Sequence, residues 1–166
     1  KLLPGLPVDA AIAAAARRAA HLAKADLVTN MVVEMTALQG VMGRYYALHS
    51  GETPEVAEAI FEHYLPRSAD DITPRGAAGL VVGLADRLDS LTGLFAAGLA
   101  PTGTKDPFAQ RRAALGLVQA LIAWDLDFDL RQGLALAAEG LPVEAGEKVR
   151  AACLEFITAR LRSYLM

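Results

Sequence analysis

The sequence predicts an all-α fold, and three observations indicate it. Hydrophobic residues make up 54% of the 166 residues but aromatic residues only 6%, so the core must be built mainly from alanine and aliphatic side chains. Alanine has the highest helix propensity and lets helices pack closely. Apolar residues recur at helical spacing along most of the chain, and no segment shows a convincing strand pattern. The length fits one domain, or one domain and part of another.

The first predicted helix begins after Asp9, which can cap its N-terminus, and reaches about Lys24. The chain that follows carries Leu27, Met31 and Met35 at helical spacing. We therefore expect a buried helix that continues through these residues, with a bend, or a pair of buried helices.

The next helix is expected from Leu38 to Leu48, and it contains Gly40 and Gly43 three positions apart. Glycines at this spacing weaken a helix but allow another backbone to approach closely, which predicts tight helix packing. A further helix follows Thr53, which can cap it, with proline in the first turn.

Two long helices are expected in the second half of the chain. One runs from Pro74 to about Gly98, and the other opens at Asp106, an N-cap followed by Pro107, and runs to about Trp124. Each is mostly apolar, which is typical of helices that face a core.

Two shorter predictions complete the chain. The alternating run Asp125, Asp127 and Asp129 lacks the glycine and the closing glutamate of a calcium loop, so we expect aspartate to cap a helix from about Leu130 to Glu139. A long amphipathic helix from about Glu144 ends the chain. Its predicted inner residues are Val149, Cys153, Phe156, Ile157 and Leu161, and its predicted outer residues are Lys148, Arg150, Arg160 and Arg162.

Composition restricts the function classes. The net charge of -3 gives no global reason to expect a nucleic-acid partner, although a local basic patch is compatible with it. A single cysteine, Cys153, excludes an internal disulfide and a cysteine-based zinc site and suits a reducing compartment. Charges interrupt every long apolar run, so no membrane span and no signal peptide are expected. Because the chain starts at Lys1 and stops at Met166 within a helical pattern, we expect it to be a piece of a longer protein.

The segment PTGTKDPFAQRR, from Pro101 to Arg112, interrupts the helical pattern with turn residues and positive charge. Lys105 precedes the expected helix start, and Arg111 and Arg112 lie on its first turns. Unpaired backbone N–H groups at a helix start together with these cations can bind a phosphate or a carboxylate. On residue types alone, an ordinary helix–loop–helix joint with solvated charges is the simpler interpretation.

No motif for nucleophilic catalysis, phosphate cradling or dinucleotide binding is present. Potential metal ligands occur on separate helices, namely Asp26, His49, His63 and Asp86. A set reduced to Asp26, His63 and Asp86 is poor for a hydrolytic metal centre. Internal hydrogen bonds or ion pairs with Lys24, Arg44 or Arg87 are the favoured interpretation of the two aspartates.

Two resemblances refine this prediction. The string LADRLDSL around Asp86 resembles the late aspartate-bearing helix of the all-α HD superfamily of phosphohydrolases, and where that superfamily has a histidine–aspartate pair this chain reads Lys24-Ala25-Asp26. More specifically, five strings in one order resemble the β subunit of the bacterial heterotetrameric glycyl-tRNA synthetase. They are KADLVTNMV (24–32), LQGVMGRYYALHSGE (38–52), EHYLPR (62–67), LADRLDSLTGLFAAG (84–98) and PTGTKDPFAQRRAALG (101–116), followed by LEFITARLRSYL (154–165).

The resemblance implies an organisation and a set of partners. Residues 1–141 would be a degenerate HD-like helical bundle, and residues 142–166 the start of the following helical region, with its long C-terminal helix. The α subunit of that family carries the active site and uses ATP and magnesium, so no cofactor is expected in this piece. The expected partners are the α subunit, the remaining β-subunit domains and tRNA(Gly), in the cytoplasm and without a membrane.

The resemblance also favours a non-catalytic role in binding tRNA or positioning subunits. Lys105, Arg111 and Arg112 are the expected phosphate contacts, although one of the two arginines can pair with Asp106 instead because they point in different directions. Secondary candidates are Arg44, Tyr45 and Arg67, with packing as the alternative role of the tyrosine. The rival functions are a metal-dependent phosphohydrolase and a loop that contacts another subunit without binding RNA.

Overall fold

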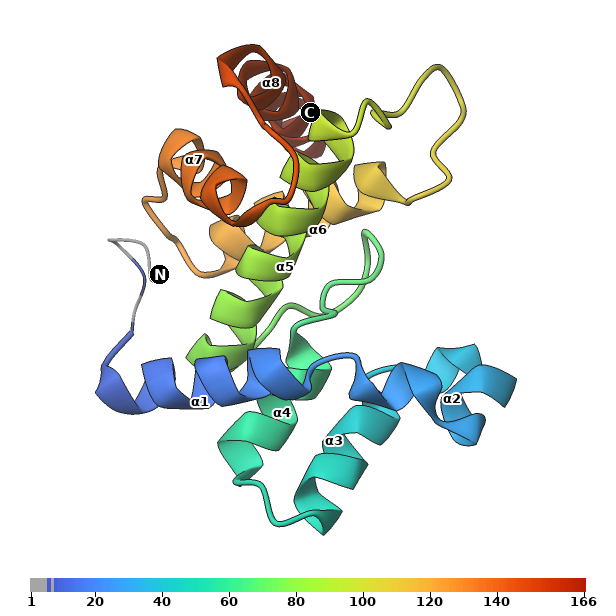
Figure 1. Cartoon of the computed structure of the whole chain (residues 1–166). Helices are drawn as coiled ribbons and strands as arrows, with labels where there is room; N and C mark the ends of the chain where they lie inside the picture. Colours follow the sequence, from blue (N-terminus) through green and yellow to red (C-terminus); the bar gives the residue numbers. More distant parts are fainter. Residues whose placement is uncertain (1–5, 7) are drawn as a thin grey trace. The chain divides into compact units, whose positions relative to one another are not determined.

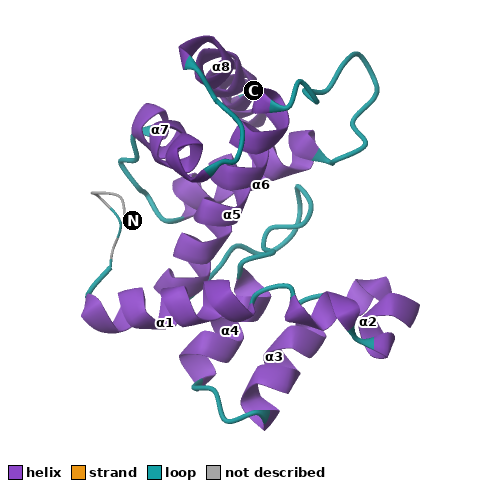
Figure 2. Ribbon diagram, viewed as in Figure 1, coloured by secondary structure: helices purple, strands orange, loops and turns teal. Residues whose placement is uncertain are grey.

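The computed structural model describes residue 6 and residues 8–166 (Figures 1 and 2). In these residues the regular secondary structure consists of helices, and there is no β-strand. The β-type pairing in this described part is an isolated bridge between Thr102 and Lys105. The final helix, α8 (Glu147–Leu165), is 19 residues long. The predicted all-α class and the long final helix are confirmed.

The described chain forms two compact units. Residues 8–65 and 72–83 make up the N-terminal unit, and residues 66–71 and 84–166 make up the C-terminal unit. Helix α5 (Ala77–Ala96) begins in the first and ends in the second. The predicted division at residues 141/142 stays a prediction.

Helices α1, α3 and α4 form the core of the N-terminal unit, with α4 packed against the other two (Figure 1). Its elements are α1 (Ala10–Leu22), the 3₁₀ turn η1 (Ala25–Val28), α2 (Asn30–Glu34), the 3₁₀ turn η2 (Thr36–Leu38), α3 (Val41–His49), α4 (Pro54–Glu62) and the start of α5. Small residues predominate at the packed faces, including Ala13, Ala16 and Ala19 of α1. Close packing through alanine is what the composition predicts.

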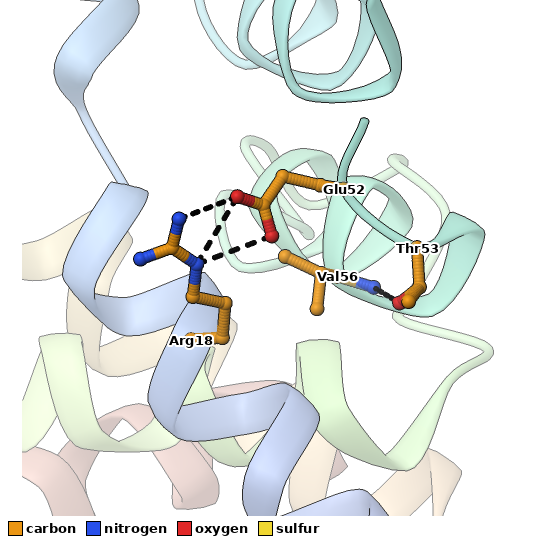
Figure 3. Close-up of polar contacts among 4 residues, drawn as sticks. All are labelled: Arg18, Glu52, Thr53 and Val56. Atoms are coloured by element: carbon orange, nitrogen blue, oxygen red, sulfur yellow. Dashed lines mark hydrogen bonds and ion pairs between the residues drawn. The ribbon is translucent and has the colours of Figure 1, made fainter. Parts of the chain in front are cut away.

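Two predicted caps are confirmed in this unit. The Asp9 carboxylate accepts the backbone N–H of Ile12 at 2.8 Å at the start of α1. The Thr53 hydroxyl accepts the N–H of Val56 at 3.3 Å at the start of α4, as Figure 3 shows. Beside this cap, the Arg18 guanidinium of α1 binds the carboxylate of Glu52 through both oxygens, which ties α1 to the chain just before α4 (Figure 3).

The prediction of a buried helix through Leu27, Met31 and Met35 is wrong. Lys24 has a φ of 69°, in the left-handed region, so α1 ends and the chain continues as η1, the five-residue α2 and η2. Leu27, Met31 and Met35 are exposed, and Val32 is the apolar residue that enters the core.

Helix α3 is capped by a side chain from another element. Gly40, its N-cap, has a φ of 78° and no side chain to cap with. Asp26 supplies the acceptor: its Oδ2 accepts the N–H groups of Gly40 at 2.7 Å and Gly43 at 3.2 Å. The glycine pair makes room mainly for side chains: a Cβ at Gly43 would lie 2.8 Å from Cγ2 of Ile60 and 3.2 Å from Oδ2 of Asp26. A Cβ at Gly40 would lie 2.5 Å from Cδ2 of Tyr64 and 3.7 Å from the backbone oxygen of Phe61.

The start of α5 repeats this arrangement. The buried carboxylate of Glu62, at the end of α4, accepts the N–H of Arg75 at 2.8 Å and of Gly76 at 2.9 Å. Gly79 lies three residues after Gly76, and a Cβ there would fall 2.5 Å from Oε2 of Glu62. Both helices thus start with two glycines three positions apart, and the second glycine, Gly43 or Gly79, leaves room for a buried carboxylate.

The C-terminal unit packs α8 against α6 (Gln110–Ala123) and α7 (Leu130–Gly140). Asp129 caps α7 as expected, accepting the N–H groups of the two residues at positions 131 and 132. Of the predicted inner face of α8, Cys153 and Ile157 are buried. Arg160 departs from its predicted outer position, since its guanidinium lies 4.9 Å from the centre of the Phe156 ring and its Nε is buried.

Among the described residues, no helix is both long and apolar enough to cross a membrane.

Candidate nucleic-acid interface

The segment between α5 and α6 is a long loop that leaves the helical core of the C-terminal unit (Figure 1). Helix α5 stops where Gly98 takes a left-handed φ of 73°, and the N–H of Leu99 bonds back to the carbonyl of Leu94 at 2.9 Å. The side chain of the buried Gln110 donates to the carbonyl of Leu99 at 2.7 Å. The two ends of the loop are therefore joined directly.

The tip of the loop is a tight turn. Thr102 and Lys105 exchange backbone hydrogen bonds of 3.2 and 2.9 Å, and Gly103 between them has a φ of 51°. The turn leaves Thr104 and Lys105 exposed. The lysine is thus presented by a turn with defined hydrogen bonds.

Helix α6 starts later than predicted. It begins at Gln110, three residues after Pro107, because Ala109 has a left-handed φ of 53° that interrupts the helical path. Asp106 nevertheless caps the helix, since its carboxylate oxygens accept the N–H of Gln110 at 2.8 Å and of Arg111 at 2.9 Å. The cap was recognisable from the sequence, whereas the extra turn before the helix was not.

Arg111 fastens the tip of the loop to the helix. Its Nη2 donates to the carbonyl of Gly103 at 2.5 Å, and its Nη1 lies 3.8 Å from Oδ2 of Asp106. The guanidinium is therefore occupied within the loop, while Lys105 and Arg112 are exposed. The expected divergence of the two arginines is observed, and Arg111 is the one that pairs with Asp106.

Phe108 is a surface residue that the sequence analysis did not select. Its side chain is 50% exposed, and it lies between the two exposed cations in sequence. Exposed aromatic rings beside positive charge are typical of surfaces that stack on unpaired bases. An aromatic residue within a turn-rich basic segment was the available signal.

Two of the secondary candidates, Arg44 and Tyr45, belong to the N-terminal unit. The Arg44 guanidinium lies 3.3 Å from the Glu58 carboxylate and 4.8 Å from the centre of the Phe61 ring. It also lies 5.3 Å from the centre of the Tyr45 ring, which is exposed. Arg44 is therefore held in place and partly neutralised, and the exposed ring is the more accessible feature.

Arg67 lies in the C-terminal unit, like the loop of residues 101–112. Its Nε is 2.9 Å from Oδ2 of Asp71. Two further side chains hold the segment of residues 66–71 that contains Arg67. The buried Arg87 donates to the carbonyl of Pro66 at 3.1 Å, and Gln119 donates to the carbonyl of Ala69 at 2.7 Å. Burial lowers the pKa of the Arg87 guanidinium.

The potential metal ligands are divided between the two units. Asp26 uses its carboxylate to cap α3, His49 is exposed, and Nδ1 of the buried His63 lies 2.6 Å from the carbonyl oxygen of Ile60. Asp86 belongs to the C-terminal unit. Within the part of the chain that the structure describes, no three His, Cys, Asp or Glu residues are grouped so as to hold a metal ion.

Comparisons with a family model and with individual proteins match the same family. The family model described as "Glycyl-tRNA synthetase beta subunit" matches residues 3–166. The glycine–tRNA ligase β subunit of Chromohalobacter salexigens is 59% identical over 123 residues, which is 74% of this chain and 18% of that protein. The corresponding subunit of Polaromonas naphthalenivorans is 51% identical over 158 residues, which is 93% of this chain and 22% of that protein.

Proposed function

Since the chain belongs to the glycyl-tRNA synthetase β-subunit family, we propose that it is a non-catalytic, tRNA-binding and architectural part of such a subunit. It would support the attachment of glycine to tRNA(Gly), with the α subunit carrying the active site and using ATP and magnesium. Its partners would be the α subunit, the remaining β-subunit domains and tRNA(Gly), in the cytoplasm. The chain spans about a fifth of the length of the relatives it matches, so these partners and this activity are all parts of the proposal.

The observation that carries the proposal is the organised loop of residues 101–112. Its tip is closed by backbone bonds, joined to α6 by Arg111 and capped by Asp106. A loop held in one conformation loses little entropy when it binds a partner. It presents Lys105, Phe108 and Arg112 to solvent.

The exposed residues suit RNA in complementary ways. Lys105 and Arg112 would neutralise phosphates, and Phe108 would stack on an unpaired base. Because the net charge of the chain is -3, attraction to RNA must come from such local groups. Arg111 would act as a positioning residue, since its guanidinium already serves the loop.

Lys105 and Arg112 replaced together by Ala in the complete synthetase provide the test. Each phosphate contact adds about 1 to the slope of log Kd against log salt, so the double variant should lower that slope by about 2. The matched control replaces Lys148 and Arg162, two exposed cations of α8, by Ala and should leave the salt slope unchanged.

The Arg111→Ala variant separates contact from positioning. It should weaken tRNA binding by loosening the loop while changing the salt slope less than either exposed cation does. An unchanged slope in the double variant would contradict the phosphate contacts. If the double variant bound tRNA normally but lost association between subunits, the loop would instead be a protein contact.

A further inference from the structure

Exposed apolar side chains are concentrated in one short stretch of the N-terminal unit. Five of the nine residues from position 27 to position 35 are large, apolar and exposed. They are Leu27, Val28, Met31, Val33 and Met35, and we refer to them as the apolar projection. Val28 is 85% exposed, Val33 61% and Met35 51%. Such a concentration of exposed apolar side chains marks an interaction surface.

The apolar projection lies on an element with little support of its own. Helix α2 has five residues, far fewer than an isolated helix needs for stability in water. Its main contacts are with the adjacent η1 and η2, and Val32 is its buried residue. In Figure 1, α2 lies at the outer edge of the N-terminal unit. A covering surface would supply the burial that this element lacks.

The charge of this stretch indicates what kind of surface covers it. Within the apolar projection, from position 27 to position 35, the only charged residue is the exposed Glu34; the exposed Lys24 and the ion-paired Arg44 lie outside it in sequence. A phosphate backbone would meet a negative charge and no cation on the projection itself. The occupant is therefore a protein surface and not RNA.

We propose that the apolar projection docks against a part of the same β subunit that lies outside these 166 residues. The inference rests on the family membership behind the proposed function, and it adds an intramolecular interface. The matched relatives are covered over only 18–22% of their length, so most of such a subunit lies elsewhere. Binding to a surface on the same polypeptide is intramolecular, at an effective concentration set by the connecting chain, and this favours such a surface over a separate chain at low concentration.

A cysteine at position 28 tests the proposal in the full-length β subunit. Val28 is 85% exposed, so Val28→Cys changes little buried surface and should not disturb folding. We expect maleimide to modify this thiol at least about tenfold more slowly in the native subunit than in denaturant, because covered thiols react slowly. Peptide mass spectrometry would read this site separately from every other cysteine. Ala14→Cys, at an exposed position of α1, is the matched control and should react readily in both states.

A photocrosslinking residue at position 28 would identify the occupant. The proposal expects crosslinks within one β subunit, to peptides outside residues 1–166, without the α subunit and at any protein concentration. Rapid labelling of the thiol in the native subunit would overturn it. So would crosslinks to residues 84–166, protection that appears only after the α subunit is added, or protection that grows with concentration. Because no step involves tRNA, failure here is distinct from an unchanged salt slope at the loop.

Discussion

Glu62 shows how one side chain can organise the start of the next helix. Its carboxylate is buried and accepts two backbone N–H groups at the beginning of α5. Burial raises the pKa of Glu62, and the hydrogen bonds from Arg75 and Gly76 lower it less than burial raises it. Glu62 therefore fixes the position of α5 but carries a cost when it is ionised.

This cost predicts a pH dependence of stability. A carboxyl whose pKa is raised in the folded state stabilises the fold fully below its unfolded pKa, and this contribution is lost as pH rises through the folded value. Unfolding free energies of the wild type and Glu62→Gln should therefore differ in their pH dependence. Rising pH above the usual glutamate pKa should cost the wild type stability that the variant does not lose. Glu155→Gln, at an exposed position of α8, is the control; an identical pH profile for all three proteins would contradict the assignment.

At the scale of elements, α3 and α5 satisfy the backbone N–H groups of their first turns in the same way. Each helix begins at a glycine that cannot cap it, and a carboxylate from another element supplies the acceptor. The second glycine, Gly43 or Gly79, leaves the space that the carboxylate fills. These positions couple neighbouring elements and make the exact helix start a tertiary property.

Gly79→Ala tests this coupling. A Cβ at this position would lie 2.5 Å from Glu62, so the intrinsic helix gain of up to about 1 kcal/mol should be outweighed by overpacking of roughly 1–3 kcal/mol. Denaturant unfolding should show a net loss of stability. Gly140→Ala, at a helical position with open space around it, should be neutral or slightly stabilising. A stabilised Gly79→Ala protein would show that the helix start can move freely.

At the scale of the whole molecule, Cys153 offers a probe of global opening. It is fully buried on α8, the helix that packs against α6 and α7, and burial raises the pKa of its thiol to about 12. Because only the thiolate reacts, labelling should wait for unfolding and accelerate with denaturant. Ala152→Cys with Cys153→Ala moves the thiol to the exposed neighbouring position and should react at once in the native state. Comparable native rates for the two proteins would show that this core opens locally.

Local side-chain chemistry in the sequence determined the fold class and several helix starts of this protein. The helical class, the caps at Asp9, Thr53 and Asp129 and the long final helix follow from composition and side-chain types near each helix start. The basic loop and the family resemblance were likewise recognisable from consecutive residues. Such features depend on contacts within a few positions, so they can be derived without the fold.

Tertiary structure decided which residues are available and which are occupied. Arg111 and Arg112 look equivalent in sequence, yet only the fold brings the carbonyl of Gly103 and the carboxylate of Asp106 to the first of them. The methionines after Lys24 have helical spacing but are exposed. The left-handed conformation of Lys24 ends the first helix, and the next turn is held by the hydrogen bond from the Gly40 N–H of α3 to the Asp26 carboxylate. Both outcomes depend on how the backbone reverses and on which groups it brings together. Residue type and spacing predict that one arginine can pair with Asp106, but they do not show which one, nor which way the methionines face.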